Sequence, residues 1–184
     1  MKTIEELGIK QWEYDSLLKV RGNLVLESMM HVLDKDLARG HAFNMGYTGS
    51  PATELDEKGN EADCGTVCCI GGWMKVIEQK WTPNEKGFIP LDYERQNLVE
   101  NYVSEAEGEL HALFYPLMSM DDYSRGNWYD EVYENGFYHV EYSKITPRQA
   151  VDAIDNYLET GSANWFQVLW GSNVLQTEEE YDND

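Results

Sequence analysis

The stretch 146-TPRQAVDAIDNYLETG-161 predicts an amphipathic helix with both of its ends marked. Thr146 precedes a proline, which suits the first helical position, and Gln149 stands where the second half of a capping box belongs. Gly161 follows at a position where a glycine commonly ends a helix. The apolar residues that recur at helical spacing, and are expected in the core, are Ala150, Val151, Ile154, Tyr157 and Leu158.

Similar signals along the rest of the chain predict a mainly α fold, a single compact helical domain of about five or six helices with long loops and room for a short β-hairpin. The expected helices span about residues 23–39, 66–80, 92–102, 104–115, 146–160 and 165–175, and a short strand is expected within 137–142. Asn23, Thr66 and Ser104 are the candidate N-caps, the last in a capping box with Glu107. We assign residues 1–176 to this domain and 177–184 to an acidic, disordered tail.

Charge is strongly unbalanced in this sequence. It contains 14 Lys and Arg against 34 Asp and Glu, a net charge of −20, and residues 150–184 include eight acidic residues and no Lys or Arg. Such a field repels nucleic acid and anionic membranes, and it attracts basic protein surfaces. Because the chain also lacks a long apolar run and a signal-peptide pattern, we expect a cytoplasmic protein that binds neither nucleic acid nor membrane.

Acidic and large aromatic residues are mixed between residues 117 and 143. Carboxylates speed the approach of a basic partner, and aromatic rings supply much of the affinity at interfaces. The same composition also fits a solvated acidic face above an aromatic core, and the sequence leaves both interpretations open. The residues of the candidate partner-binding surface are Asp121, Asp122, Trp128, Tyr129, Asp130, Glu131, Tyr133, Glu134 and Glu141.

All three cysteines lie in the motif 64-CGTVCCIGGW-73. Cys64 and Cys69 are weak candidates for metal ligands, because a zinc site needs four ligands and usually pairs cysteines two to four residues apart. The simpler interpretation is a helix start where Cys69 acts as a small apolar side chain and Gly71 and Gly72 allow another helix to approach closely. We therefore expect no metal and no cofactor.

A pocket between the loop at residues 40–65 and the helix that follows it is the alternative kind of site. Cys64 at a helix N-terminus would be its nucleophile and His41 its base, although nothing in the sequence fixes their geometry. The candidate lining of this small-ligand, metal or enzyme site is His41, Phe43, Asn44, Cys64 and Thr66. We assign no catalytic residue.

Five segments, at residues 43–45, 64–73, 113–116, 145–151 and 158–165, together carry a resemblance that covers about residues 23–166. In this order they resemble a family of uncharacterised small proteins found in bacteriophages, prophages and bacteria. This chain departs from the family at Cys68 and Gly71, where the family usually has Ala. The resemblance implies a cytosolic, phage-like helical protein, and it transfers no catalytic residue because the family has no established activity.

Together these features favour a non-enzymatic, phage-type interaction protein that binds a basic surface of a host protein in the host cytoplasm. An inhibitor of a nucleic-acid-binding or defence protein, acting as a mimic of DNA, fits this description. The pocket described above is the alternative, and an assembly component of a virion is a third possibility. The sequence identifies neither the partner nor the oligomeric state.

Overall fold

The computed structural model describes residues 1–33, 43, 45, 69–82, 92–116, 137–140, 142–170, 172 and 175–177. Its helices are α1 (Ile4–Leu7), α2 (Gln11–Leu33), α3 (Ile70–Glu78), α4 (Tyr93–Glu105), α5 (Gly108–Phe114), α7 (Pro147–Thr160) and α8 (Trp165–Leu169), with a 3₁₀ helix, η2 (Tyr142–Lys144). The predicted mainly α fold is confirmed, and the described part contains seven α-helices where five or six were expected. None of the described helices is both long and apolar enough to cross a bilayer.

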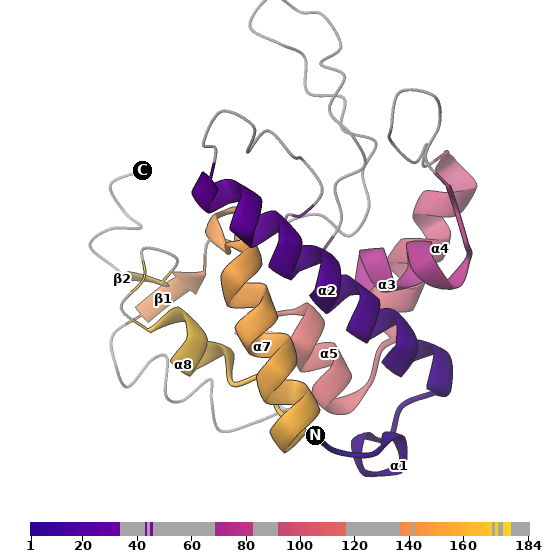
Figure 1. Cartoon of the computed structure of the whole chain (residues 1–184), viewed down its shortest axis with the longest axis horizontal. Coiled ribbons are helices and arrows are strands. Elements are labelled where there is room, and N and C mark those ends of the chain that lie inside the picture. Colours follow the sequence, from indigo (N-terminus) through magenta and orange to yellow (C-terminus); the bar gives the residue numbers. More distant parts are fainter. Residues whose placement is uncertain are drawn as a thin grey trace, which may run out of the picture.

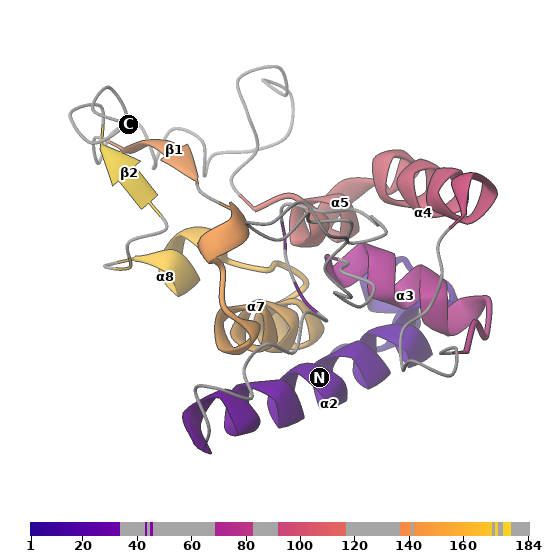
Figure 2. The ribbon, with the colours of Figure 1, turned by 90° about the horizontal axis from the view of Figure 1, so that it is seen from above.

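Helix α2 runs along one side of the molecule and contacts both α7 and α3 (Figure 1). Seen from above, α7 and α3 lie next to α2, and α8, α5 and α4 lie farther from α2, beyond them (Figure 2). The helices enclose one main core, in which Leu17, Phe114 and Tyr157 are fully buried. Helix α4 reaches this core through its packing on α3 and α5.

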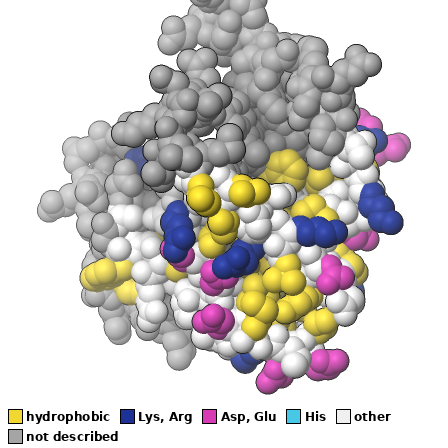
Figure 3. Space-filling view, viewed as in Figure 1, with side chains coloured by type: hydrophobic (Ala, Val, Ile, Leu, Met, Phe, Trp, Pro, Cys, Tyr) yellow, Lys and Arg dark blue, Asp and Glu magenta, His cyan; other side chains and the backbone are white. Residues whose placement is uncertain are grey.

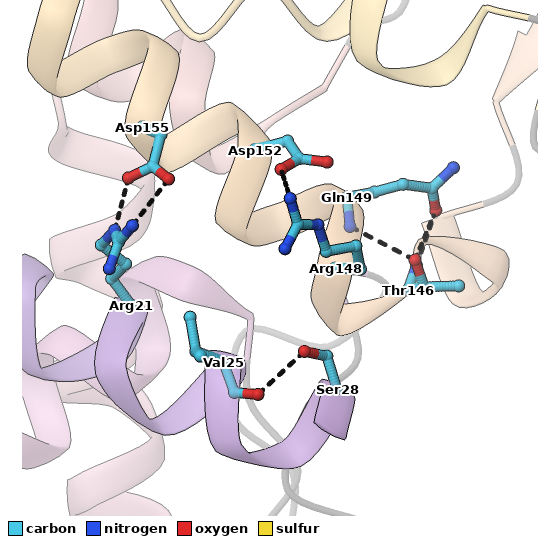
Figure 4. Close-up of polar contacts among 8 residues, drawn as sticks. All are labelled: Arg21, Val25, Ser28, Thr146, Arg148, Gln149, Asp152 and Asp155. Carbon is cyan, nitrogen blue, oxygen red and sulfur yellow. Dashed lines mark hydrogen bonds and ion pairs between the residues drawn. The ribbon is translucent and has the colours of Figure 1, made fainter. Parts of the chain in front are cut away.

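Helix α7 has both of the ends that the sequence predicted. The Thr146 hydroxyl oxygen accepts a hydrogen bond from the Gln149 N–H at 3.3 Å, and the Gln149 side-chain oxygen accepts one from the Thr146 N–H at 2.9 Å (Figure 4). Gly161 ends the helix with a φ of 90°, a left-handed conformation that a glycine adopts without strain. All five of its predicted core residues are buried.

Helix α2 begins at Gln11, so the prediction that Asn23 caps it is wrong. Leu17, Val20 and Leu24 are buried at helical spacing, and their packing outweighs the cost of about 1 kcal/mol for a glycine inside the helix. Asn23 predicts a helix start because its capping preference is local, whereas the burial of Leu17 and Val20 comes from packing against distant helices.

Two further details of the N-terminal region differ from the prediction. Met29, expected in the apolar stripe of its helix, is 57% exposed. Helix α1 was not predicted; it is a single turn closed by a capping box between Thr3 and Glu6. A turn this short has no apolar period to detect, so only its caps identify it.

Helix α3 begins at Ile70 with Cys69 as its N-cap, and the predicted start near Thr66 is wrong. The Cys69 sulfur accepts a hydrogen bond from the Gly72 N–H at 3.4 Å. A thiol at position 69 therefore caps this helix, in place of the predicted threonine hydroxyl at position 66. The predicted close approach is confirmed at Gly71, where an added Cβ would lie 2.9 Å from side-chain carbons of both Val103 and Phe114. Thr66 itself lies outside the described residues.

The predicted capping box of Ser104 and Glu107 is also wrong. Ser104 lies inside α4, where its hydroxyl donates a hydrogen bond to the Asn101 carbonyl oxygen at 3.1 Å. Serine often bonds back to its own helix in this way, so its presence alone does not mark a helix start. Glu107 precedes α5 without a side-chain cap, and α5 ends before Pro116 as predicted.

Two short strands complete the described structure. Strand β1 (Phe137–Val140) confirms the expected strand and pairs antiparallel with β2 (Leu175–Thr177), with Val140 opposite Leu175. The two strands are separated by α7 and α8, so they do not form a hairpin. Thr177 belongs to β2, and residues 178–184 of the predicted tail lie outside the described residues.

The close packing at Gly71 predicts a destabilising Gly71→Ala substitution. The free energy of unfolding should fall by about 1–3 kcal/mol, because the new methyl group meets two buried side chains. Gly22→Ala is the matched control, since nothing lies within 4 Å of its added Cβ, and it should raise the same free energy by about 0.5–1 kcal/mol. Urea denaturation of both variants measures the difference, and equal effects would contradict the close approach.

Candidate functional site

The candidate sites predicted from the sequence fall mostly outside the described residues. This holds for all of the predicted partner-binding surface, namely Asp121, Asp122, Trp128, Tyr129, Asp130, Glu131, Tyr133, Glu134 and Glu141. It also holds for His41, Asn44, Cys64 and Thr66 of the alternative pocket. Phe43 is described, and it is partly buried against the core. Both sites therefore stay predictions.

Cys69 is placed as a structural residue. Its side chain is 1% exposed, and burial raises the pKa of the thiol to about 11 because apolar surroundings disfavour a thiolate. Over the described ranges, no three His, Cys, Asp or Glu side chains are grouped so that they could hold a metal ion. The position fits the interpretation of Cys69 as a small apolar side chain.

A cavity of about 880 Å³ lies where α1, the start of α2, the α4–α5 junction and the end of α7 meet. In Figure 1 these helix ends gather near the N-terminus. The Lys2 N–H donates a hydrogen bond of 2.7 Å to the Leu158 carbonyl oxygen, which fixes the start of the chain to the end of α7. The cavity is thus built by elements that are far apart in sequence.

Glu13 lines this cavity and is only 6% exposed. One carboxylate oxygen accepts a hydrogen bond from the Lys10 N–H at 2.7 Å, and the other accepts one from the Tyr102 hydroxyl at 3.4 Å. No Lys or Arg side chain of the described residues forms an ion pair with Glu13. A buried carboxylate without a cation is energetically costly, so its retention here needs a reason.

Aromatic contacts hold Tyr102 beside Glu13. Its ring centroid lies 5.1 Å from that of Trp12 and 5.7 Å from that of Phe114, and the Lys75 ammonium nitrogen lies 5.4 Å from it. Burial, and then the negative charge of Glu13, raises the pKa of the Tyr102 hydroxyl. The hydroxyl therefore stays protonated at neutral pH and donates to the carboxylate.

Tyr157, on α7, carries another buried hydroxyl, and it is not among the residues that line the cavity. Its side chain is fully buried, and its oxygen has no hydrogen-bond partner within the part of the chain that the structure describes. Burial raises its pKa, as do the charges of Glu13 and Glu109, which both line the cavity. Among the described residues, this hydroxyl is therefore an unsatisfied polar group inside the core.

The cavity lining is acidic, with five glutamates and two lysines. Glu6 belongs to the α1 capping box, and hydrogen bonds to Thr3 lower its pKa. Glu105, Glu107 and Glu109 are exposed, and none of them forms an ion pair with a described Lys or Arg. These three residues and Glu13, named here the glutamate cluster, therefore carry negative charge without a basic neighbour in contact.

The face formed by α2 and α7 has a different charge pattern. Basic and acidic side chains lie next to each other there (Figure 3). Arg21 binds Asp155 with two hydrogen bonds, and Arg148 contacts Asp152 at 3.0 Å (Figure 4). Asp152 and Asp155 on this face are thus paired with arginines, whereas no carboxylate of the glutamate cluster is in ion-pair contact with a described Lys or Arg.

Sequence reasoning missed this site. The alternation Glu105-Ala-Glu107-Gly-Glu109 is visible in the sequence, and it was interpreted as part of a capping box. Nothing in the sequence marks Glu13, because its contact with Tyr102 of α4 forms only in the folded chain. Comparisons with protein-family models, curated proteins and solved structures find no match.

The orphaned hydroxyl predicts that Tyr157→Phe leaves the free energy of unfolding unchanged or raises it by up to about 1 kcal/mol. Tyr102→Phe is the control, since it removes a donor from Glu13 and should lower the same free energy by about 1 kcal/mol. Thermal and urea unfolding measure the free energy of unfolding of both variants. A clear loss of stability in Tyr157→Phe would show that its hydroxyl is bonded.

The raised pKa of Cys69 predicts an unreactive thiol. In a Cys64→Ser/Cys68→Ser variant at pH 8, the remaining thiol should react with a disulfide reagent more than about 100-fold slower than a free thiol, because little of it is ionised. Unfolding the same variant in guanidinium should restore the normal rate. Fast labelling of the folded protein would instead indicate an accessible thiolate.

Proposed function

We propose that this protein is an acidic interaction protein that binds a basic surface of another protein. The observation that carries the proposal is the glutamate cluster, whose four carboxylates line one cavity without a Lys or Arg in ion-pair contact among the described residues. Partner cations would supply the missing countercharges. They would also offset the cost of burying Glu13.

The charge of the whole chain supports the same proposal. A net charge of −20 produces a long-range field that accelerates the approach of a basic protein. Asp155 and Asp152 on the α2–α7 face are paired with Arg21 and Arg148, whereas the carboxylates of the glutamate cluster have no such partner among the described residues, so the glutamate cluster would attract a basic surface more strongly. Exposed glutamates would speed the association of the two proteins. A buried carboxylate such as Glu13 would instead slow the dissociation of the complex.

The partner that fits best is a protein whose own ligand is a polyanion. A nucleic-acid-binding or defence protein of a host presents a basic cleft, and an acidic surface can occupy that cleft in place of DNA. The predicted surface at residues 121–141 follows α5 in the chain and would extend the contact beyond the glutamate cluster. In this proposal the protein acts as an inhibitor by occupying the cleft.

A small-ligand binder is the second candidate. The cavity volume of about 880 Å³ lies within the range of about 300–1,000 Å³ that is typical of small-molecule sites. Such a ligand would be cationic, because the lining is predominantly acidic.

Glu107→Gln/Glu109→Gln should weaken partner binding. Proteins retained from an extract of the source cells are compared between the unmodified chain, this variant and the control Glu94→Gln/Glu159→Gln, whose glutamates are exposed and outside the cavity. A basic protein retained by the unmodified chain and the control, and reduced with the cavity variant, is the expected result. Equal retention by the two variants would contradict a role of the glutamate cluster.

Kinetics with the purified partner complete this test. Raising the ionic strength from about 0.05 M to about 0.3 M should slow association roughly tenfold, because salt screens the steering charges. Neutralising Asp130, Glu131 and Glu134 together should slow it further if the predicted surface takes part. An association rate independent of salt would argue against electrostatic recognition.

A further inference from the structure

We propose that two copies of this chain associate through the α2–α7 face, with their α2 helices antiparallel and related by a two-fold axis close to Gly22. The contact packs an apolar ridge of α2 on the same ridge of the second copy, and it places opposite charges of the two α7 helices against each other. The inference does not depend on the proposed function, because the residues of both ridges lie outside the cavity lining.

The apolar ridge lies along an exposed side of α2. Leu18 is 36% exposed, Leu26 is 62% exposed and Met29 is 57% exposed, and hydrophobic side chains are visible on this face in Figure 3. Gly22 lies between them, and no described atom lies within 4 Å of a Cβ added there. The four positions recur at helical spacing, so they form one continuous surface that a second helix can approach closely at the glycine.

A charged ridge lies beside it on α7. It consists of Arg148, Asp152, Asp155 and Glu159, whose spacing of four, three and four residues places them on one side of their helix. Arg148 begins the ridge and contacts Asp152 through one nitrogen, and with 70% of its side chain exposed it has further N–H groups to donate. Glu159 ends the ridge and is exposed. The charged ridge is therefore basic at its first residue and acidic at its last.

The two helices run in opposite directions, and one ion pair marks the middle of the face. Asp155 binds Arg21, which precedes Gly22, and the end of α7 meets the start of α2 at the cavity (Figure 4). Arg148 therefore lies toward the end of α2, whereas Glu159 lies toward its start.

Rotation about an axis close to Gly22 exchanges the two ends of the face. Arg148 of each copy then lies opposite Glu159 of the other, and Leu18 lies opposite the part of α2 that contains Leu26 and Met29. A two-fold contact requires that one surface complement itself in this way. Both the apolar and the charged ridge meet this requirement, which favours a second copy over an unrelated protein as the occupant.

The net charge of −20 limits where two copies can meet, because the copies repel each other. On the α2–α7 face, Asp152 and Asp155 are already in contact with arginines, so association here brings few unpaired carboxylates together. At an ionic strength of about 0.15 M the Debye length is about 8 Å, which screens the distant charges more than those in contact.

Sedimentation equilibrium of the full chain over a concentration series, at an ionic strength of about 0.15 M, tests this proposal. The unmodified chain should show a monomer–dimer equilibrium. Leu26→Glu should raise its dissociation constant about tenfold or more, because a two-fold contact contains the substitution twice. Leu98→Glu is the matched control, since Leu98 is a 46% exposed leucine of α4, and it should change the constant less than about twofold.

Exchange of the charged ends tests the antiparallel arrangement and leaves the apolar ridge intact. Arg148→Glu and Glu159→Arg should each weaken the dimer, because each variant places like charges opposite each other at two positions. An equimolar mixture of the two variants should form a heterodimer about tenfold tighter than either variant alone, because opposite charges then meet at both positions. This measurement also decides the case if Leu26→Glu does not fold.

Each outcome supports or overturns the inference. A dimer that Leu26→Glu weakens, and that the mixed charge variants form preferentially, supports it. A chain that stays monomeric at every concentration overturns it and leaves the face to another occupant. A dimer unaffected by Leu26→Glu, or no gain on mixing the charge variants, also overturns it, because the copies then meet in another way.

Discussion

Burial of the apolar face of α7 is the interaction on which the structure depends most. The buried face contacts α2 on one side and α5 and α8 on others, and Ile154, Tyr157 and Leu158 from it are completely excluded from solvent. The C-terminal end of α7 also positions the start of the chain, because the Leu158 carbonyl oxygen accepts a hydrogen bond from the Lys2 N–H. The cavity therefore exists as a consequence of how α7 is packed and where it ends.

The elements that could be predicted from sequence are those whose signals are local and redundant. Thr146, Pro147, Gln149 and Gly161 all mark the same helix, and the apolar spacing agrees with them. Where a single signal stands alone it misleads: Asn23 and Ser104 each predict a helix start, although each lies inside a helix. In both places packing against distant residues outweighs the local preference.

The site was predictable only in its general charge. The acidic excess indicated a basic partner, but the buried carboxylate lies between Trp12 and Tyr14, in a stretch with no motif. Its neighbours come from Lys10 in the same region and Tyr102 far along the chain. Such a juxtaposition is a property of tertiary structure, since no spacing in the sequence relates positions 13 and 102.

The docking of the first residues has a practical consequence for handling this protein. The Tyr14 hydroxyl donates a hydrogen bond of 3.1 Å to the Met1 sulfur, and the Lys2 N–H donates one to the Leu158 carbonyl oxygen, so Met1 is held next to Lys2, which forms part of the cavity wall. Any affinity tag joined ahead of Met1 emerges next to that wall and competes with incoming molecules. Purification handles therefore belong at the other terminus, or must be cleaved before binding is measured.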